Sequence, residues 1–199
     1  MRRIVMFNNV SADGFFSTAD GKLDWFVQED GVYKASQESN PNIDTLLFGR
    51  KTYDMFEAYW PHALDESGTA KDPHHPEHRS AAIHDMAVFI NDVKKIVFSR
   101  SRQSVTWKNS ELIPELEPAK IKALKSGPGK DMMIFGSGSL VSQLTQHGLI
   151  DEYVFVVNPV ILGNGRSLLR DVTKTLKLDL KEARPFPSGV VLQRYALPG

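Results

Sequence analysis

Short runs of apolar residues alternate with segments of helical spacing along most of the chain. Runs rich in β-branched residues predict buried strands at residues 3–10, 44–49, 95–99, 131–135 and 152–157, with a shorter one at 105–107. Apolar positions that recur every three to four residues predict helices at 24–39, 50–59, 82–93, 114–125 and 139–147. Pro118 either kinks the fourth helix or marks its start. Such alternation favours a mostly parallel sheet covered by helices.

The end of the chain breaks this alternation. Residues 176–183 and 190–197 have the character of two strands joined by a turn at 185–189, which predicts an antiparallel hairpin. The pattern therefore predicts an α/β protein with a mostly parallel central sheet of about eight strands and an antiparallel C-terminal edge. No repeat or linker divides the sequence, so we expect a single domain over residues 1–199. Residues 60–81, rich in proline and charge, predict a long surface loop that would serve as a flap over a substrate.

Composition narrows the class of protein. Lys plus Arg and Asp plus Glu each total 24, and the zero net charge argues against nucleic-acid binding. The lack of cysteine excludes disulfides, thiolate metal sites and cysteine nucleophiles. No segment approaches the ~20 apolar residues that a membrane helix needs, and the apolar start of the chain is too short for a signal peptide. We therefore expect a cytoplasmic protein without membrane contacts.

Three histidines, His74, His75 and His78, raise the question of a metal site. Histidine is a common metal ligand. These three, however, lie in the predicted loop with no cysteine nearby, and without a helix His74 and His78 could meet only if the loop folded to bring them together. We therefore predict that the chain holds no metal.

A glycine-rich turn follows the strand predicted at 131–135. Gly136-Ser137-Gly138-Ser139 leads directly into a predicted helix, so free backbone N–H groups and the positive end of the helix dipole face whatever lies above the turn. Such a turn suits a phosphate, and it equally serves as a tight connection without a ligand. Val141 stands where a Rossmann fingerprint has its third glycine, which disfavours a Rossmann domain.

Two further strand ends carry cations and hydroxyl groups. The strand at 44–49 ends in Gly49-Arg50-Lys51-Thr52, and the strand at 95–99 ends in Ser99-Arg100-Ser101-Arg102. Arginine binds phosphates through paired hydrogen bonds, and ligands of open α/β sheets bind at the carboxyl ends of the strands. These turns predict an anionic ligand, with solvated charges on a polar loop as the alternative.

In this order, the motifs GRKT, SRS and FGSGSL resemble those of the dihydrofolate reductase superfamily. The chain is most similar to single-domain relatives of the C-terminal reductase domain of the bifunctional riboflavin-biosynthesis deaminase/reductase. Those relatives share a turn like residues 11–14 and a late segment like residues 149–169. The resemblance spans nearly the whole chain. It implies a three-layer, dihydrofolate-reductase-like α/β fold, NADPH as the cofactor and a homodimer.

The resemblance also assigns cofactor contacts by position. One part of NADPH would lie against Gly49, Arg50, Lys51 and Thr52. The pyrophosphate would lie against Gly136, Ser137, Gly138, Ser139 and Leu140. Ser99 and Arg100 would lie near the adenosine and its 2′-phosphate, and an arginine there favours NADP over NAD.

Two acids are candidates for contact with the substrate. Asp13 ends the first strand, where the resemblance implies a catalytic role near the nicotinamide, although an aspartate before a glycine is also a common turn former. Asp24 directly precedes Trp25 and Phe26. Dihydrofolate reductases carry their substrate-binding acid three residues ahead of such a pair, so this departure puts dihydrofolate reduction in doubt and leaves a solvated aspartate as the alternative.

Trp60, Asn158 and Arg166 are further candidates for the substrate side. Trp60 belongs either to the core or to a stacking platform for a flat heterocycle. Asn158 and Arg166 lie in a region that, by the resemblance, borders the substrate pocket or the dimer contact. Arg166 suits an anion, with a solvated charge as the alternative.

The expected function is that of an NADPH-dependent oxidoreductase that transfers hydride to a small heterocycle. The resemblance suggests a pterin-like or aminopyrimidine-like ring, as in dihydrofolate reductase and 5-amino-6-(5-phosphoribosylamino)uracil reductase. A nucleotide- or flavin-binding module of the same fold without efficient chemistry is the alternative. The deaminase domain that accompanies the riboflavin-pathway reductase carries zinc ligands, and a chain without cysteine has no counterpart to them.

Overall fold

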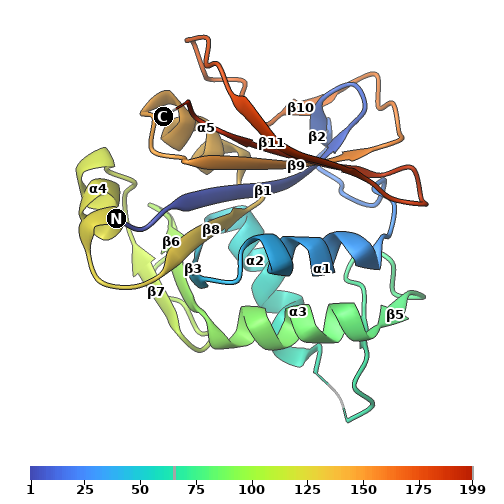
Figure 1. Ribbon diagram of the computed structural model, residues 1–199. Helices are drawn as coiled ribbons and strands as arrows, with labels where there is room; N and C mark the ends of the chain where they lie inside the picture. Colours follow the sequence, from blue (N-terminus) through green and yellow to red (C-terminus); the bar gives the residue numbers. More distant parts are fainter. Residues whose placement is uncertain (65, 199) are drawn as a thin grey trace.

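An eight-stranded sheet forms the centre of the molecule (Figure 1). The computed structural model describes residues 1–64 and 66–198. The strands of the sheet are β1 (Ile4–Ser11), β3 (Ile43–Gly49), β6 (Lys94–Phe98), β7 (Ser110–Ile113), β8 (Asp131–Phe135), β9 (Glu152–Asn158), β11 (Asp179–Pro185) and β12 (Val191–Ala196). Their order is β11-β12-β9-β1-β8-β3-β6-β7, with β9 to β7 parallel and with β12 and β11 antiparallel at one edge. The predicted sheet is confirmed.

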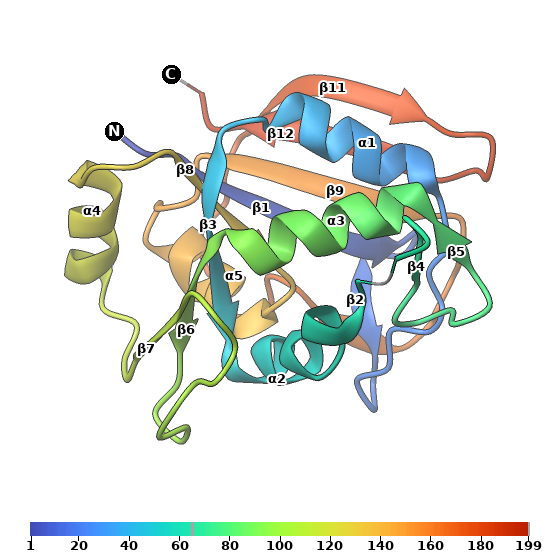
Figure 2. The ribbon, with the colours of Figure 1, turned by 90° about the horizontal axis from the view of Figure 1, so that it is seen from below.

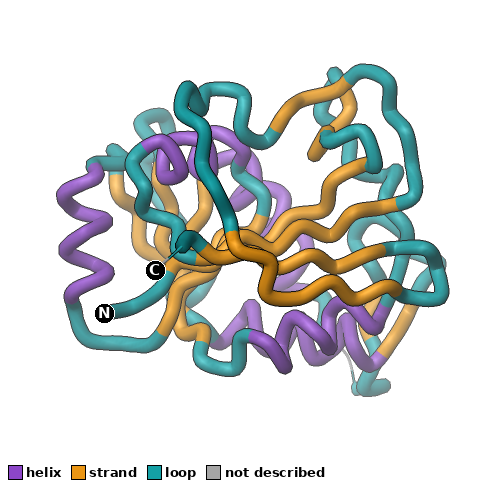
Figure 3. Tube along the Cα trace, turned by 45° about the horizontal axis from the view of Figure 1, so that its top comes forward, coloured by secondary structure: helices purple, strands orange, loops and turns teal. Residues whose placement is uncertain are grey.

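Helices cover both faces of this sheet, as Figures 2 and 3 show. One face carries α1 (Asp30–Ser39), α2 (Arg50–Tyr59) and α3 (Ala81–Asp92), and the other carries α4 (Pro118–Ser126) and α5 (Gly138–Gln146). The strands feed both cores, because successive side chains point to opposite faces. Strands that are buried on both faces appear in the sequence as continuous apolar runs.

Two short strand pairs and one 3-10 turn lie outside the central sheet and were not predicted. β2 (Phe15–Thr18) pairs with β10 (Gly165–Ser167), and β4 (Ala70–Lys71) pairs with β5 (Arg79–Ser80). A 3-10 turn, η1 (Trp60–His62), follows α2. The loop expected at residues 60–81 therefore contains short elements of its own. The pair β2–β10 matters for the site, since it carries Phe16 and Arg166.

The helix predicted at residues 24–39 begins only at Asp30, so Asp24 does not lie on a helix. The side chain of Glu29 caps the helix by accepting a hydrogen bond from the Gly31 N–H at 3.1 Å. The preceding backbone bonds elsewhere: the Val27 N–H donates to Asn158 Oδ1 at 2.8 Å, and the Phe26 carbonyl lies 3.1 Å from His75 Nε2. These bonds to distant side chains replace the helical ones.

The strand predicted at residues 105–107 was also wrong, because the strand that pairs with β6 is β7, Ser110–Ile113. The carboxylate of Glu57 accepts hydrogen bonds from the Thr106 and Trp107 N–H groups, at 3.3 and 3.2 Å. These donors are therefore not available to a sheet. Trp107 is buried instead, and its Nε1 donates to Asn91 Oδ1 at 2.9 Å.

The other elements agree with the predictions to within a few residues. α2 has the predicted bounds, and Pro118 is the first residue of α4, so it starts that helix and does not kink it. The closing hairpin forms from β11 and β12, three residues later than predicted at its start. Within the described residues, no helix is long and apolar enough to cross a bilayer.

Candidate functional site

The carboxyl ends of three adjacent strands, β8, β3 and β6, deliver the predicted turns to one edge of the sheet. Hydrogen bonds lock two of these turns together. Ser137 Oγ accepts from the Gly49 N–H at 2.8 Å and donates to Thr52 Oγ1 at 2.9 Å, and the Ser137 N–H donates to the same Thr52 oxygen at 3.0 Å. The glycine-rich turn and the GRKT turn are therefore one rigid unit.

Glycines at this edge let the chain pass closely. Gly136 has φ +58°, a conformation that disfavours other residues, and a Cβ there would lie 3.1 Å from Thr52 Oγ1. A Cβ on Gly138 would lie 2.9 Å from the ring of Phe16. Ser137 also adopts a left-handed conformation, with φ +59°, so two successive residues turn the chain into α5. The helix then begins with its first N–H groups facing the edge.

A cavity of about 580 Å³ opens above these turns, and we call it the anion cavity. Its lining includes ten of the predicted site residues: Gly49, Arg50, Lys51, Thr52, Ser99, Arg100, Ser137, Gly138, Ser139 and Arg166. Arg170 also lines it, which brings five basic side chains to one hollow. Within the described residues, no carboxylate lines this cavity. Five cations with the N-termini of α2 and α5 form a site for a polyanion.

Three of the basic side chains that line the anion cavity bond to groups outside its lining. Arg50 pairs with Asp54 at 3.1 Å, and Arg100 pairs with Glu115. Arg166 lines the cavity, and its Nε donates to the Ala19 carbonyl at 3.2 Å. Leu140 is buried beneath the turn and lines a smaller hollow with Ser99 and Arg100. Leu140 thus contributes packing at this edge.

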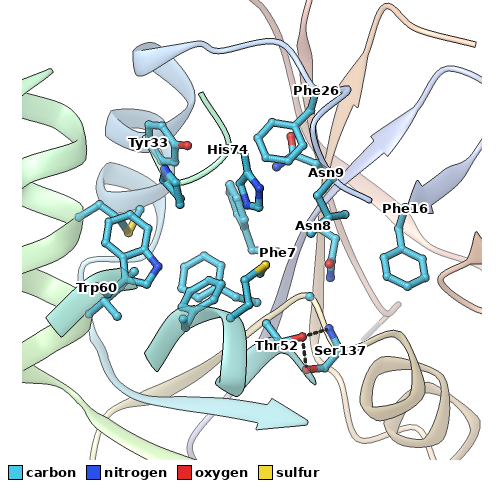
Figure 4. A pocket seen from close by; sticks show the side chains of 18 residues that line it. Phe7, Asn8, Asn9, Phe16, Phe26, Tyr33, Thr52, Trp60, His74 and Ser137 are labelled. Atoms are coloured by element: carbon cyan, nitrogen blue, oxygen red, sulfur yellow. Dashed lines mark hydrogen bonds between the residues drawn. The ribbon is translucent and has the colours of Figure 1, made fainter. Parts of the chain in front are cut away.

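A second cavity, of about 150 Å³, adjoins the first (Figure 4). We call it the aromatic cavity, because seven of its lining residues are aromatic: Phe7, Phe16, Phe26, Tyr33, Phe56, Trp60 and Phe135. The two cavities share Phe16, Leu23, Thr52, Met55 and Ser137. In the described part of the chain, no Asp, Glu, Lys or Arg lines the aromatic cavity. A long ligand can therefore lie with a charged end in one cavity and a flat ring at the mouth of the other.

Few polar groups line the aromatic cavity. Asn8 is 5% exposed, and its Nδ2 has no hydrogen-bond partner in the described part of the protein. Burial lowers the pKa of His74, and burial raises the pKa of Tyr33, so both side chains are neutral near pH 7. The Tyr33 hydroxyl donates to Asp72 at 3.4 Å. Figure 4 shows Asn8 near Phe16 and the Thr52–Ser137 pair, and His74 between Tyr33 and Phe26.

Asp13 lies outside the lining of both cavities. Its carboxylate is exposed and accepts three hydrogen bonds, from Ser11 Oγ at 2.6 Å, the Gly163 N–H at 2.7 Å and the Leu162 N–H at 3.1 Å. The Ser11 bond is the main reason why the pKa of Asp13 lies below its usual value. In this structure Asp13 ties the turn after β1 to the loop after β9.

Asp24 and Asn158 also stay out of the cavity linings. Asp24 is exposed. Asn158 is completely buried, and its amide donates to Asn9 Oδ1 at 3.1 Å and to the Val156 carbonyl at 3.0 Å while accepting from Val27. Asn158 thus has partners on every side and positions the segment before α1. Trp60, in contrast, is buried and lines the aromatic cavity.

The sequence analysis missed most of the aromatic cavity. Asn8, Phe16, Tyr33 and His74 line it, and none of them was a candidate for binding a substrate. Only Asn8 left a usable signal, because Asn8 and Asn9 interrupt an otherwise apolar strand. Of the three histidines of the loop, His78 pairs with Asp30 at 3.0 Å. Among the described residues, no group of three or more His, Cys, Asp or Glu side chains is arranged to hold a metal ion.

Comparisons with known proteins agree with this geometry. The family model described as "RibD C-terminal domain" matches residues 2–192. The uncharacterized protein YyaP of Bacillus subtilis is 30% identical over 194 residues, covering 96% of this chain and 92% of that protein. A putative riboflavin biosynthesis protein from Shewanella sp. PV-4 superposes over 100% of both chains with a TM-score of 0.71 at 20% identity.

A dihydrofolate reductase from Enterococcus faecalis, solved with NADP(H), superposes with a TM-score of 0.62 at 14% identity. The match covers 99% of this chain and 97% of the reductase. At such identity the likeness concerns the fold, which is the predicted dihydrofolate-reductase-like fold.

Proposed function

The chain belongs to the RibD C-terminal domain family, whose fold and relatives indicate a reductase-type protein, and from this premise we propose that it is an NADPH-dependent reductase of a small heterocycle. The observation that carries the proposal is the continuity of the two cavities. A basic hollow, whose described lining contains no carboxylate, opens into an aromatic hollow through shared residues, among them Phe16, Thr52 and Ser137. A dinucleotide with charged phosphates and a flat reactive ring has the same division of charge along its length.

The residues at the sheet edge fit NADPH. Arg50, Lys51, Arg100 and Arg166 would neutralise phosphates, and the N-termini of α2 and α5 add N–H donors. Gly136 and Gly138 keep the turn free of side chains that would fill it. Ser99 and Arg100 would hold the adenosine end, where an arginine favours the 2′-phosphate of NADP.

In such a reductase, bound NADPH supplies the hydride. Reduction of a C=N or C=O bond adds this hydride to carbon and one proton to nitrogen or oxygen, which yields the amine or alcohol and NADP⁺. The aromatic walls exclude water from the reacting bond. Among the described residues that line the aromatic cavity, Tyr33 and His74 are the titratable ones. Since Tyr33 already donates to Asp72, we assign delivery of the proton to the imidazolium form of His74, which burial makes a stronger acid by lowering its pKa, or to a water that the neutral ring orients.

A titration of NADPH and NADH, followed by tryptophan fluorescence, tests the cofactor assignment. Trp60 lines the aromatic cavity and is well placed to report a bound nicotinamide. We expect NADPH to bind at least about tenfold more tightly than NADH, a difference of about 1.4 kcal/mol. Arg100→Ala should remove most of this preference while NADH affinity stays unchanged. If neither dinucleotide binds, the cofactor assignment is wrong.

A nucleotide- or flavin-binding module without efficient chemistry is the second candidate. The observation that favours it is that no carboxylic acid is among the described residues that line the aromatic cavity, since Asp13 and Asp24 lie outside this lining. Consumption of NADPH with pterin and aminopyrimidine substrates separates the two candidates. Turnover would support the reductase. Tight flavin binding together with no hydride consumption by any of these rings would support the module.

A further inference from the structure

The aromatic cavity differs from the anion cavity in the charge of the side chains that line it. Its described lining has neither carboxylates nor basic side chains, whereas the neighbouring anion cavity has five basic ones. We propose that the aromatic cavity takes an uncharged, phosphate-free ring that accepts a hydrogen bond from Asn8. This proposal rests on the reductase function above, because it names the substrate class of the same site.

Among the described residues that line this cavity, none is an acid that could pair with a cationic ring such as a protonated aminopyrimidine. Asp72, which is 1% exposed, is a buried acid bonded to two of the lining residues, His74 and Tyr33. Its oxygens are already occupied, since the His74 and His75 N–H groups donate to it at 2.7 and 2.9 Å and the Tyr33 hydroxyl donates at 3.4 Å. Transfer of an unpaired charge from water into such a place is costly. A substrate that must be charged to bind is therefore disfavoured.

A phosphorylated substrate is disfavoured for the complementary reason. All basic side chains that line the two cavities in the described structure belong to the anion cavity: Arg50, Lys51, Arg100, Arg166 and Arg170. In the proposed enzyme these cations hold the phosphates of the cofactor. A substrate phosphate would then lie among apolar walls without an arginine or a lysine to pair with.

Asn8 supplies the specific contact. It lies in the middle of β1, 5% exposed, with an Nδ2 that lacks a partner while the amide of its neighbour Asn9 is bonded to Asn158. An unsatisfied buried donor costs ~1–3 kcal/mol, which a ligand oxygen or ring nitrogen would recover. Figure 4 shows this amide near Phe16 and Ser137, two residues that line both cavities. The acceptor of the substrate would therefore lie close to the bond that is reduced.

The test compares two near-isosteric probes on protein saturated with NADP⁺, so that anions cannot occupy the anion cavity. Quinoxaline-2-carboxamide and quinoxaline-2-carboxylate share a ring and a shape and differ in charge. We expect calorimetric affinity for the carboxamide to exceed that for the carboxylate by at least about tenfold. A second pair, 5-aminouridine and its 5′-phosphate, should favour the unphosphorylated compound. The proposal would be overturned if the carboxylate or the 5′-phosphate bound as tightly as its neutral counterpart or more tightly. It would also be overturned if neither neutral probe bound.

Two variants with a matched control sharpen this test. Met55 lines both cavities and is only partly buried on α2, so Met55→Lys should fold and should shift the preference about tenfold toward the carboxylate. Ala58→Lys adds the same charge to an exposed position of α2 outside the linings and should leave the preference unchanged. Asn8→Ala should weaken both probes to a similar degree, because each presents an oxygen that can accept from Asn8, and should leave the preference between them unchanged. Equal effects of the two lysines would contradict the proposal.

The outcome also separates this inference from the proposed function. NADPH binding is measured independently of the probes. If NADPH binds and the carboxylate is preferred, the substrate class is wrong and the cofactor assignment stands. If NADPH does not bind, the reductase function fails, and the change in preference caused by Met55→Lys relative to Ala58→Lys on cofactor-free protein still decides whether the aromatic cavity selects neutral rings.

Discussion

At the scale of single residues, hydrogen-bond partners separate architecture from candidate binding groups. Asp13 and Asn158 both lie near the carboxyl end of a strand, and the protein itself satisfies their oxygens. Asn8, in contrast, lines the aromatic cavity and has a buried Nδ2 without a partner in the described part of the protein. A buried or recessed polar group that the fold leaves unpaired is one that a ligand is positioned to satisfy.

Asp13→Asn should lower the melting temperature and leave the turnover of the folded enzyme unchanged. The carboxylate joins the turn after β1 to Leu162 and Gly163, and its pKa is lowered by these bonds and mainly by Ser11. Its contribution to stability is present above the unfolded-state pKa and is lost as pH falls through the folded-state pKa. Thermal melts and steady-state kinetics measure the two effects. Lost turnover at an unchanged melting temperature would instead support a catalytic Asp13, and Asp179→Asn is the control.

Arg50→Ala should weaken NADPH binding about tenfold and leave the fold intact. The side chain is 46% exposed and pairs with Asp54 on the same helix, and exposed pairs of this kind contribute only ~0–1 kcal/mol to stability. Loss of a charge-assisted contact to a phosphate costs about 1.5–3 kcal/mol in binding. Arg184→Ala, with a side chain of similar exposure on β11, is the matched control. Equal affinities of the two variants would remove Arg50 from the site.

At the scale of elements, the apolar pattern of the sequence correctly predicted the elements whose backbone groups do not bond to side chains from distant parts of the chain. α2 has the expected bounds because its apolar face and its glycine boundary lie within the same twelve residues. Residues 24–29 and 105–107 did not form the predicted helix and strand, since their backbone groups bond to side chains from distant parts of the chain: Asn158 and His75 in the first case and Glu57 in the second. Apolar periodicity carries no information about such partners.

Glu57 connects α2 to the segment that follows the Ser99–Arg102 turn. It accepts from Thr106 Oγ1 at 2.8 Å and from the Tyr53 hydroxyl at 3.0 Å, and it pairs with Arg102. Burial alone would raise its pKa, but the hydrogen bonds from Thr106 and Arg102 outweigh burial and lower the pKa from 4.5 to about 2. The helix that carries Arg50 and the loop that carries Arg100 are thereby fixed relative to each other.

Glu57→Gln should destabilise the protein by ~1–3 kcal/mol at neutral pH, because charge-assisted hydrogen bonds are lost. A carboxyl with a depressed folded-state pKa stabilises fully above its unfolded pKa, near 4.5, and this contribution disappears as pH falls toward 2. The difference from the unmodified protein should therefore shrink over that window in urea unfolding. Glu111→Gln, in an exposed pair with Lys94, should show almost no difference at any pH. A gap independent of pH would contradict this account of Glu57.

At the scale of the whole molecule, a sheet covered on both faces brings distant segments to one edge. The glycine, hydroxyl and cation turns could be predicted because each lies within a few residues of its strand. The aromatic cavity could not, since Asn8, Tyr33, Trp60 and His74 come from four separate elements or loops that meet only in the fold. The same convergence places a neutral cavity beside a basic one, which is the basis of the proposed selectivity.

Leu46 and Leu47 test whether the two faces of this sheet unfold as one domain. Both leucines are fully buried on β3, and they belong to cores on opposite faces. Each Leu→Ala change should cost ~2–5 kcal/mol and, in a single cooperative domain, should lower one and the same calorimetric transition by several degrees. β3 leads into Gly49 and Thr52, which line the anion cavity. In a single cooperative domain these residues stay in place until the whole protein unfolds, so either change should reduce NADPH binding only at temperatures where the protein unfolds. Two separate transitions, each sensitive to one leucine, would show that the faces unfold independently.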